Sequence, residues 1–279
     1  MRLFLFPIST RRTLIYCQRL NVTTSEQQTL LDKGTSRAAA LWSSWEKKES
    51  GWQKKVVDYG NKALQRIPYE EWGLKSIPPL SARRKEEELS GKEKVEVSFP
   101  GSLIPEATIT DLLRKLGTER QSLHKKRMMW SFVGMPISAP IALIPVIPNL
   151  PFFYLVYRAW SHWRALSGSK HIEFLLDNKL LTIQPSKILD DIYASGESPF
   201  IPTPALEQGS TTTSGSEAEK MLIHKSTGKK IAEVLKVPEL EMELDRAVWQ
   251  VEKAISAEAE LKREKKDLDG VNEESKKEK

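Results

Sequence analysis

The residue types that most often bind metals or act as nucleophiles are sparse in this chain. Of its 279 residues, four are histidine, at positions 124, 162, 171 and 224, and one is cysteine, Cys17. Metal-binding motifs place such residues a few positions apart, and these histidines lack that spacing. A single cysteine cannot close an intramolecular disulfide or build a cysteine metal site. The sequence therefore predicts no metal and no other cofactor, and structural roles for the histidines.

One short stretch is superficially similar to a phosphate-binding loop. The residues "STGKK", 226–230, include the Gly-Lys pair of that motif. However, Ile223 stands where its first glycine is needed, and Lys230 stands where a serine or threonine would bind magnesium. The sequence also contains neither a G-x-S-x-G nor an H-E-x-x-H motif. We therefore expect that the protein is not an enzyme.

The elements that would position any functional group surround one unusually apolar segment. The chain as a whole is polar and basic, with a mean hydropathy of -0.43, a net charge of +6 and a pI of about 9.2. Such a balance favours anionic partners. Residues 128–157, by contrast, contain no charged side chain. This run is longer than the ~20 residues that a helix needs to cross the hydrocarbon core of a bilayer.

Prolines interrupt the apolar segment. Five of them fall within it, and each interior proline removes a backbone donor from a helix and crowds the preceding turn. We predict a hairpin with one arm near 128–144, a turn in "PVIPNLP" and a return arm from 152 onward. The expected turn residues are Pro145, Pro148, Asn149 and Pro151. The alternative is a proline-rich hairpin buried inside a soluble domain.

Basic residues flank the segment on both sides. No acidic residue lies between Arg120 and Ile172, and the positive-inside rule retains basic flanks on one side of a membrane, as a shallow or complete hairpin would do. The expected interfacial and basic residues are Lys125, Lys126, Arg127, Trp130, Arg158, Trp160, His162, Trp163 and Arg164. His124 and His162 could sense pH at the membrane edge, and interfacial hydrogen bonding is their simpler role.

The N-terminus, residues 1–25, is basic and free of acids. Its arginines and hydroxyl residues are typical of a mitochondrial targeting sequence. The runs "RLFLF" and "TLIYC", separated by "PISTRR", also predict a small β-hairpin. The two interpretations can coexist, because an uncleaved N-terminus can both direct import and fold.

The remainder is expected to make the protein mainly α-helical, with matrix-side helices around one proline-broken membrane hairpin at 128–157. Apolar residues recur at helical spacing over 36–66 and again at Leu240, Leu244, Ala247, Val251 and Ala254, and the last helix is expected to begin at Pro238. The run "VEVSF" alternates like a short strand. The expected segments are a basic amphipathic helical region (26–80), a charged linker (81–94), a strand and helix leading to the membrane (95–127), a helical region after it (158–202), a linker (203–220), a C-terminal helical region (221–262) and a disordered charged tail (263–279).

Four stretches together resemble one family. They are "MRLFLFPISTRRTLIYCQRL", "RQSLHKKRMMW", "PVIPNLPFFYLVYRAWSHWRALSGSKHIEFL" and "LDRAVWQVE". They are similar to the fungal mitochondrial potassium/proton exchange-related family, over roughly residues 1–255. The resemblance implies an inner mitochondrial membrane protein linked to potassium/proton exchange and brings no catalytic residues with it. It also weakens the interpretation of the N-terminus as a cleaved presequence.

The residues themselves argue against transport by this chain alone. An antiporter needs a group that binds a proton and a cation in turn, usually a carboxylate within the membrane, and this apolar segment has none. One hairpin also cannot enclose a transport path. We expect a subunit or regulator that binds anionic lipid and forms a homo-oligomer or joins other exchange subunits. The alternative is a membrane anchor or assembly factor that binds cardiolipin or the mitochondrial ribosome.

Overall fold

A four-stranded sheet lies at the centre of the molecule. The computed structural model describes residues 1–18, 47–91, 95–140, 149–195 and 219–277, and single positions 37, 41, 44 and 45. The strands are β1 (Arg2–Pro7), β2 (Thr13–Gln18), β3 (Val95–Phe99) and β4 (Leu181–Pro185), in the order β2-β1-β3-β4. Strands β1 and β2 are antiparallel, and the other two pairings are parallel. The predicted N-terminal β-hairpin is thus confirmed, and its first strand is central in the sheet.

Helices fill the connections between the strands. Among the described residues, three helices precede β3, four helical segments lie between β3 and β4, and three helices follow β4. In chain order they are α2 (Trp52–Gln65), α3 (Tyr69–Ser76), α4 (Ala82–Leu89), η2 (Glu106–Thr108), α5 (Ile109–Thr118), α6 (Gln121–Ser138), α7 (Leu150–Asp177), α8 (Lys187–Ser195), α9 (Lys225–Val234) and α10 (Pro238–Lys277). The expectation of a mainly helical protein is confirmed.

Strands β1 and β2 are buried on both faces of the sheet, whereas the edge strand β4 is half-buried or exposed. Successive side chains of a strand point to opposite faces, so Leu3 and Leu5 join one apolar cluster while Phe4 and Phe6 join another. The first cluster takes in buried residues of α3, α5 and α7, and the second takes in residues of α8, α9 and α10. One layer of helices therefore carries α7 against the sheet, and the opposite layer is built largely from the C-terminal part of the chain.

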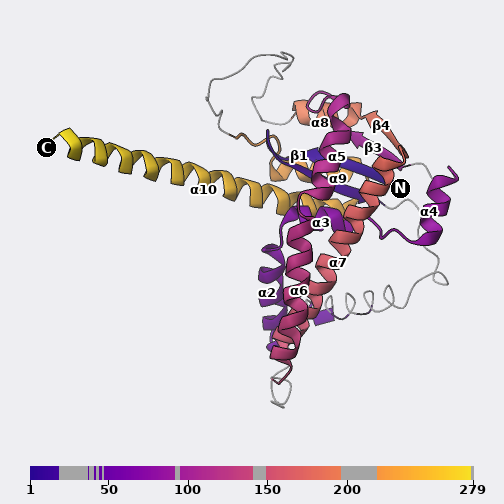
Figure 1. The fold of residues 1–279 in the computed structure, drawn as a ribbon, viewed down its shortest axis with the longest axis horizontal. Coiled ribbons are helices and arrows are strands. Elements are labelled where there is room, and N and C mark those ends of the chain that lie inside the picture. Colours follow the sequence, from indigo (N-terminus) through magenta and orange to yellow (C-terminus); the bar gives the residue numbers. More distant parts are fainter. Residues whose placement is uncertain are drawn as a thin grey trace.

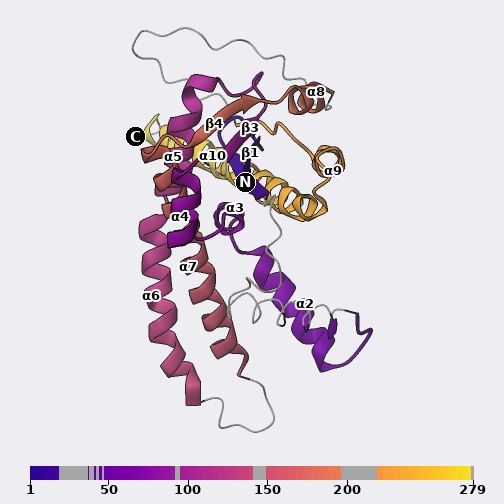
Figure 2. The ribbon, with the colours of Figure 1, turned by 90° about the vertical axis from the view of Figure 1, so that its right-hand side faces the viewer.

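Helices α6 and α7 form a long antiparallel hairpin whose far end projects away from the sheet (Figures 1 and 2). This agrees with the predicted two-armed arrangement. Asn149 joins the arms: its side-chain nitrogen donates to the Ser138 carbonyl oxygen over 2.7 Å, and its oxygen caps α7 at the Phe152 amide. Pro151 lies in the first turn of α7, where a missing amide hydrogen costs nothing. Predicted turn residues Pro145 and Pro148 lie outside the described residues.

The helices of this hairpin differ from the predicted membrane arms. Among the described residues, no helix combines the length and the apolarity required to cross a bilayer. The return arm also extends well beyond the expected boundary at 157, because α7 continues to Asp177 and packs on the sheet. The far part of the hairpin and the part packed on the body thus belong to one continuous helix.

Two other expectations need correction. The charge-dense stretch 81–94 was expected to be a linker, yet 82–89 form α4, which begins at Ser81 with a bond from the Arg84 amide to the serine hydroxyl. The tail beyond 262 was expected to be disordered, yet α10 continues to Lys277 and extends far from the body (Figure 1). Composition alone misjudged both, because neither stretch shows an apolar stripe long enough to predict a packed helix.

Smaller differences concern where helices break. The helix expected over 36–66 is interrupted ahead of α2 at Gly51, whose φ of +105° favours glycine. The helix expected to run unbroken into the apolar segment ends as α5 and restarts at Gln121 as α6. Most of the linker expected at 203–220 lies outside the described residues.

Candidate functional site

A buried group of charged and polar side chains lies where the hairpin meets the body. Helix α3 supplies Glu71 and Lys75, one helical turn apart, α6 supplies His124, and α7 supplies Arg158, Ser161 and His162. Residues three and four positions apart share one face of a helix, so each helix presents its members together. We call these six residues the root network, because they lie at the body end of the hairpin.

Glycine allows α3 and α7 to approach closely enough for these contacts. A Cβ atom added at Gly168 of α7 would lie 2.1 Å from the carbonyl oxygen of Leu74. On α3 itself, a Cβ atom at Gly73 would lie 2.4 Å from the carbonyl oxygen of Ile15. The two glycines therefore hold α3 against both the sheet and the longer hairpin helix.

Glu71 is fully buried and fully engaged. Arg158 donates to both carboxylate oxygens, over 2.9 and 3.1 Å, and the Ser161 hydroxyl donates to one of them over 2.5 Å. Burial by itself would raise the pKa of Glu71, but the Ser161 hydrogen bond and the Arg158 guanidinium outweigh it and hold that pKa below its ordinary value. Glu71 is therefore an ionised carboxylate whose charge Arg158 balances.

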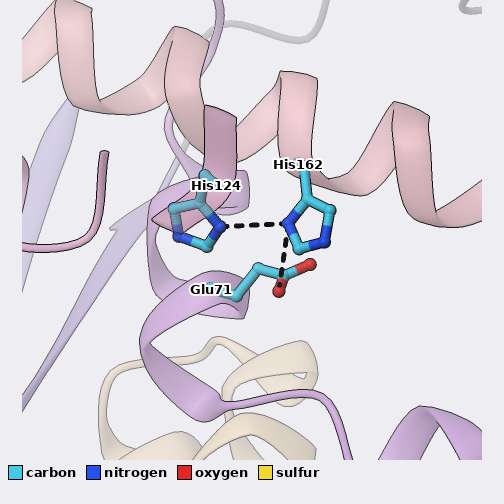
Figure 3. Close-up of side chains that lie close together, drawn as sticks. All are labelled: Glu71, His124 and His162. Carbon is cyan, nitrogen blue, oxygen red and sulfur yellow. Dashed lines mark hydrogen bonds and ion pairs between the residues drawn. The ribbon is translucent and has the colours of Figure 1, made fainter. Parts of the chain in front are cut away.

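The two histidines share a hydrogen bond whose direction can be assigned. Arg158 Nη2 lies 3.0 Å from His162 Nε2, and a guanidinium can only donate, so that nitrogen accepts. The neutral His162 ring therefore carries its proton on Nδ1, which lies 3.0 Å from His124 Nδ1 (Figure 3). His124 then carries its proton on Nε2, a buried atom without a partner among the described residues.

Burial keeps both rings neutral. It lowers the pKa of His162 to about 4, because the charge on Glu71 only partly offsets the loss of solvent and Arg158 opposes a second positive charge. Burial likewise lowers the pKa of His124. At neutral pH the root network therefore holds one arginine, one carboxylate and two uncharged imidazoles.

The surroundings of this cluster do not fit a metal ion. Ligand atoms of Glu71, His124 and His162 lie within 4.8 Å of one another, close enough for one ion (Figure 3). A metal-binding histidine normally donates its second ring nitrogen to an acceptor. Here the second nitrogen of His162 faces the donor Arg158, and Arg158 also occupies both oxygens of Glu71. The geometry suits a hydrogen-bond network better than coordination of a metal ion.

Lys75 is the least satisfied member of the network. Its side-chain nitrogen lies 3.4 Å from the centre of the Trp72 ring and donates to the Tyr157 hydroxyl over 3.2 Å. The rings of Tyr157 and Trp160 lie 5.2 and 5.4 Å from it. Burial lowers the pKa of Lys75 to about 7, although Glu71 and Glu243 favour its charged form. This amine therefore titrates near neutral pH.

A second buried carboxylate, on α4, contacts a histidine further along α7. His171 Nε2 lies 2.9 Å from both oxygens of Glu88 on α4, and His171 Nδ1 lies 2.8 Å from the Pro78 carbonyl oxygen. Both ring nitrogens thus face acceptors. The pair fastens α4 to the hairpin helix, and it accounts for a third histidine as structural.

The residues predicted as a basic, interfacial flank fall into two groups. Arg158 and His162 are buried in the root network, so they do not lie at a solvent or lipid boundary. Arg164 is half-buried and donates to the Lys75 carbonyl oxygen over 3.0 Å, and Trp160 is also half-buried. The exposed ones are Lys125, Lys126, Arg127, Trp130 and Trp163. For the exposed residues, an interfacial position stays a prediction.

The outside of the hairpin is unusually apolar. Ten of the nineteen large hydrophobic side chains that are exposed among the described residues lie on α6 or α7. Examples are Ile137, which is 75% exposed, and Phe153, which is 62% exposed. Nearer the body, Ser122, Leu123, Lys126, Arg127 and Trp130 line a groove of about 420 Å³. Exposed apolar surface of this extent marks a contact with lipid or with another protein.

Several residues of the root network were not found from the sequence. Glu71, Lys75 and Ser161 lie in ordinary helical patterns, and the Arg158 that pairs with Glu71 is 87 positions away. No local signal identifies such a pair. A weak hint is that Arg158 follows the uncharged run immediately, where a helix that continues into a protein core must neutralise its first charge.

Comparisons with known proteins agree with the resemblance noted above. A family model described as mitochondrial K+-H+ exchange-related matches residues 2–176. An uncharacterized protein of Schizosaccharomyces pombe is 30% identical over 190 residues, covering 68% of this chain and 81% of the relative. An uncharacterized protein of Saccharomyces cerevisiae is 26% identical over 281 residues, covering 91% of this chain and 85% of the relative. No solved structure matches the chain.

Proposed function

Because the chain belongs to the mitochondrial K+-H+ exchange-related family, we propose that it supports potassium/proton exchange at the inner mitochondrial membrane as a subunit or regulator. The family description implies the mitochondrial location and the link to exchange. The observation that carries the rest is the hairpin, which exposes apolar side chains along its length and lysine and arginine nearer the body. An apolar end with a basic collar suits insertion into an anionic membrane surface.

The dimensions of the hairpin favour a shallow insertion. Its uncharged helical arms are 128–138 and 150–157, which at 1.5 Å per residue measure about 16 and 12 Å. The hydrocarbon core is about 30 Å thick. Arms of this size reach about as deep as one leaflet. The sheet and the remaining helices then stay on one side, which we assign to the matrix because Lys125, Lys126 and Arg127 flank the hairpin there.

The charges of the hairpin argue against transport by this chain alone. Its described apolar arms contain no carboxylate, and the buried carboxylate Glu71 lies at the root, engaged by Arg158. A carrier would need such a group to be released to bind protons and cations in turn. The chain therefore acts on exchange through lipid and partner contacts, as a homo-oligomer or together with other exchange subunits.

Liposome flotation tests the membrane contact. Purified protein is mixed with vesicles of phosphatidylcholine with or without cardiolipin, and the floated fraction is measured. The double variant Ile137→Glu, Phe153→Glu places two charges on the apolar surface of the hairpin and should reduce the floated fraction at least tenfold. Val234→Glu is the matched control, because Val234 is an exposed apolar residue on α9, away from the hairpin. Equal flotation of all three proteins would refute hairpin insertion.

Exchange itself is tested in two settings. Mitochondria that lack the protein should swell in a potassium-dependent manner and lose exchange activity, whereas the pure chain in liposomes should show no potassium/proton flux. Robust flux by the pure chain would make it the carrier. Tags on either terminus should resist protease added to mitoplasts, and cleavage of just one tag would indicate a single crossing.

A membrane anchor or assembly factor without a role in transport is the competing function. The basic groove beside Trp130 supports it, because lysine and arginine also bind the phosphates of cardiolipin or of ribosomal RNA. Normal exchange in mitochondria that lack the protein, together with co-sedimentation of the protein with mitochondrial ribosomes at moderate salt, would favour this function.

A further inference from the structure

We propose that Lys75 is a proton-operated switch at the root of the hairpin: its uncharged form holds α3, α7 and α10 together, and its protonation loosens them. The inference deepens the proposed function by giving it a means of regulation. It rests on that function only for its consequence for exchange, because the titration of Lys75 is a property of the protein itself.

The first argument is the position of Lys75. It lies on α3, its amine contacts Tyr157 and Trp160 of α7, and its nearest ring, Trp72, also contacts Arg246 of α10 at 4.3 Å. The side chain is only 6% exposed. Any change in the charge of this amine therefore acts on three helices at once.

The second argument is the lack of a counter-ion. Among the described residues, no carboxylate oxygen lies within 4.0 Å of the Lys75 nitrogen, and its one hydrogen-bond partner is the Tyr157 hydroxyl. A buried ammonium group offers three donors and needs either a carboxylate or several acceptors. Aromatic rings compensate for part of that need through cation–π attraction, which leaves the charged form tolerated but less favourable than in water.

The charged groups around Lys75 oppose one another. On its own helix, Glu71 favours the ammonium form, but Arg158 of α7 already pairs with that carboxylate. On α10, Glu243 favours the ammonium form of Lys75. Arg246 disfavours that form, and its Nη1 atom lies 2.6 Å from Oε2 of Glu243. Neither carboxylate is therefore free to hold the proton on Lys75, and the amine loses it near pH 7.

We call the contact of α3, α7 and α10 around Lys75 the joint. Unpaired donors next to Lys75 indicate that the joint has too few hydrogen-bond acceptors when Lys75 is charged. The Trp72 Nε1 and Arg246 Nε atoms are both buried without a hydrogen-bond partner among the described residues. An added proton on Lys75 increases an existing excess of buried donors at one place. Opening the joint to water would relieve this excess, because water supplies acceptors.

The direction of the pH effect follows from linkage. In the folded state Lys75 loses its proton near pH 7, and in the unfolded chain it does so near 10.5. Between these values the closed state gains stability as the pH rises, and this gain is absent below pH 7. The joint is therefore tightest when the surroundings are alkaline and loosest when protons accumulate.

An NMR titration tests the switch directly. In full-length protein with 13C-labelled lysine, the Cε resonance that disappears in Lys75→Met should titrate near pH 7, well below the ~10.4 of a lysine in water. Lys170→Met, at an exposed lysine of α7, is the control for the assignment of that resonance. Titration of Lys75 together with the exposed lysines would overturn the proposal.

Two neighbouring variants supply tests of opposite sign. Arg246→Gln removes a repelling charge and should raise the pKa of Lys75, whereas Glu243→Gln removes an attracting one and should lower it. Hydrogen exchange, corrected for its intrinsic pH dependence, should become slower in α3 and α10 as the pH rises above 7 in the native protein but not in Lys75→Met. Equal exchange in both proteins at pH 6 and 8 would show that Lys75 does not control the joint, whatever the outcome of the membrane and flux assays.

Discussion

Helix α7 carries two buried glutamate–histidine sites that use the same residue types in opposite ways. At the first, Arg158 balances the charge of Glu71 and turns its donors toward His162, which leaves that ring neutral. At the second, no arginine intervenes, and His171 faces Glu88 and the Pro78 carbonyl oxygen with both nitrogens.

The contrast shows that, for two rings buried to the same extent, the neighbouring groups decide which hydrogen bonds each ring makes. Both rings are almost fully enclosed, yet one makes a hydrogen bond with a second histidine and the other faces a carboxylate and a carbonyl oxygen. The first site ties the hairpin to α3 through arginine, and the second ties it to α4 through histidine itself.

Removal of Arg158 should have the largest effect. Arg158→Met leaves Glu71 buried without its counter-charge, which costs about 3–5 kcal/mol in the free energy of unfolding. Urea denaturation measures this loss. The added change Glu71→Gln should restore part of the stability, because the unpaired charge is then gone. A double variant as unstable as the sum of the two single variants would show that the pair is not coupled.

Breaking the second site should cost less. Glu88→Gln removes the charge that His171 faces, but α4 is a short helix that can separate from α7 and let water reach the ring. We expect a loss of about 1–3 kcal/mol, accompanied by faster amide hydrogen exchange in α4. Glu86→Gln on the exposed side of the same helix is the control. Unchanged exchange in α4 would mean that this pair does not fasten it.

Acidification should destabilise the protein through the buried His162. The folded protein keeps His162 neutral down to about pH 4, whereas the unfolded chain protonates it near 6.5. The stability that the neutral ring provides is thus complete above pH 6.5 and is lost as the pH falls toward 4, by up to about 1.4 kcal/mol per pH unit. His162→Gln should flatten this slope in denaturation experiments, and His224→Gln, which changes an exposed ring, should leave it intact. Identical slopes in both variants would contradict the assignment.

The exposed surface of the hairpin gives the smallest effect and the reference for the others. Ile137→Ser removes a side chain that contacts little within the fold, so the free energy of unfolding should change by less than about 0.5 kcal/mol. Thermal denaturation in the absence of lipid measures it. A loss of several kcal/mol would mean that Ile137 is covered by other parts of the chain.

The elements that could be predicted are those specified by local patterns. The 4-3-4 spacing of Leu240, Leu244, Ala247 and Val251 predicted the buried face of α10, and all four are buried. Alternation in "VEVSF" predicted β3. Prolines predicted the break between α6 and α7. In each case the signal and the structure that it specifies lie within a few residues of each other.

The site could not be predicted because its partners are distant in the chain. Arg158 and His162 were expected at a membrane boundary, since they directly follow an apolar run. In the structure α3 packs over them, and no pattern in the sequence near residue 158 indicates a contact with Glu71. The same reason explains α4, whose position depends on Glu88 meeting His171, 83 residues later.

The position of β1 bears on the order of import and folding. The basic, acid-free N-terminus has the composition of an import address, yet Leu3 and Leu5 are fully enclosed, and β1 lies between β2 and β3. An import signal made of these residues can be recognised only while the chain is unfolded, because folding buries them. A protease that trimmed the address after import would also remove the middle of the sheet. Any recognition of residues 1–18 as an import signal has to come before folding, because the folded protein buries most of them.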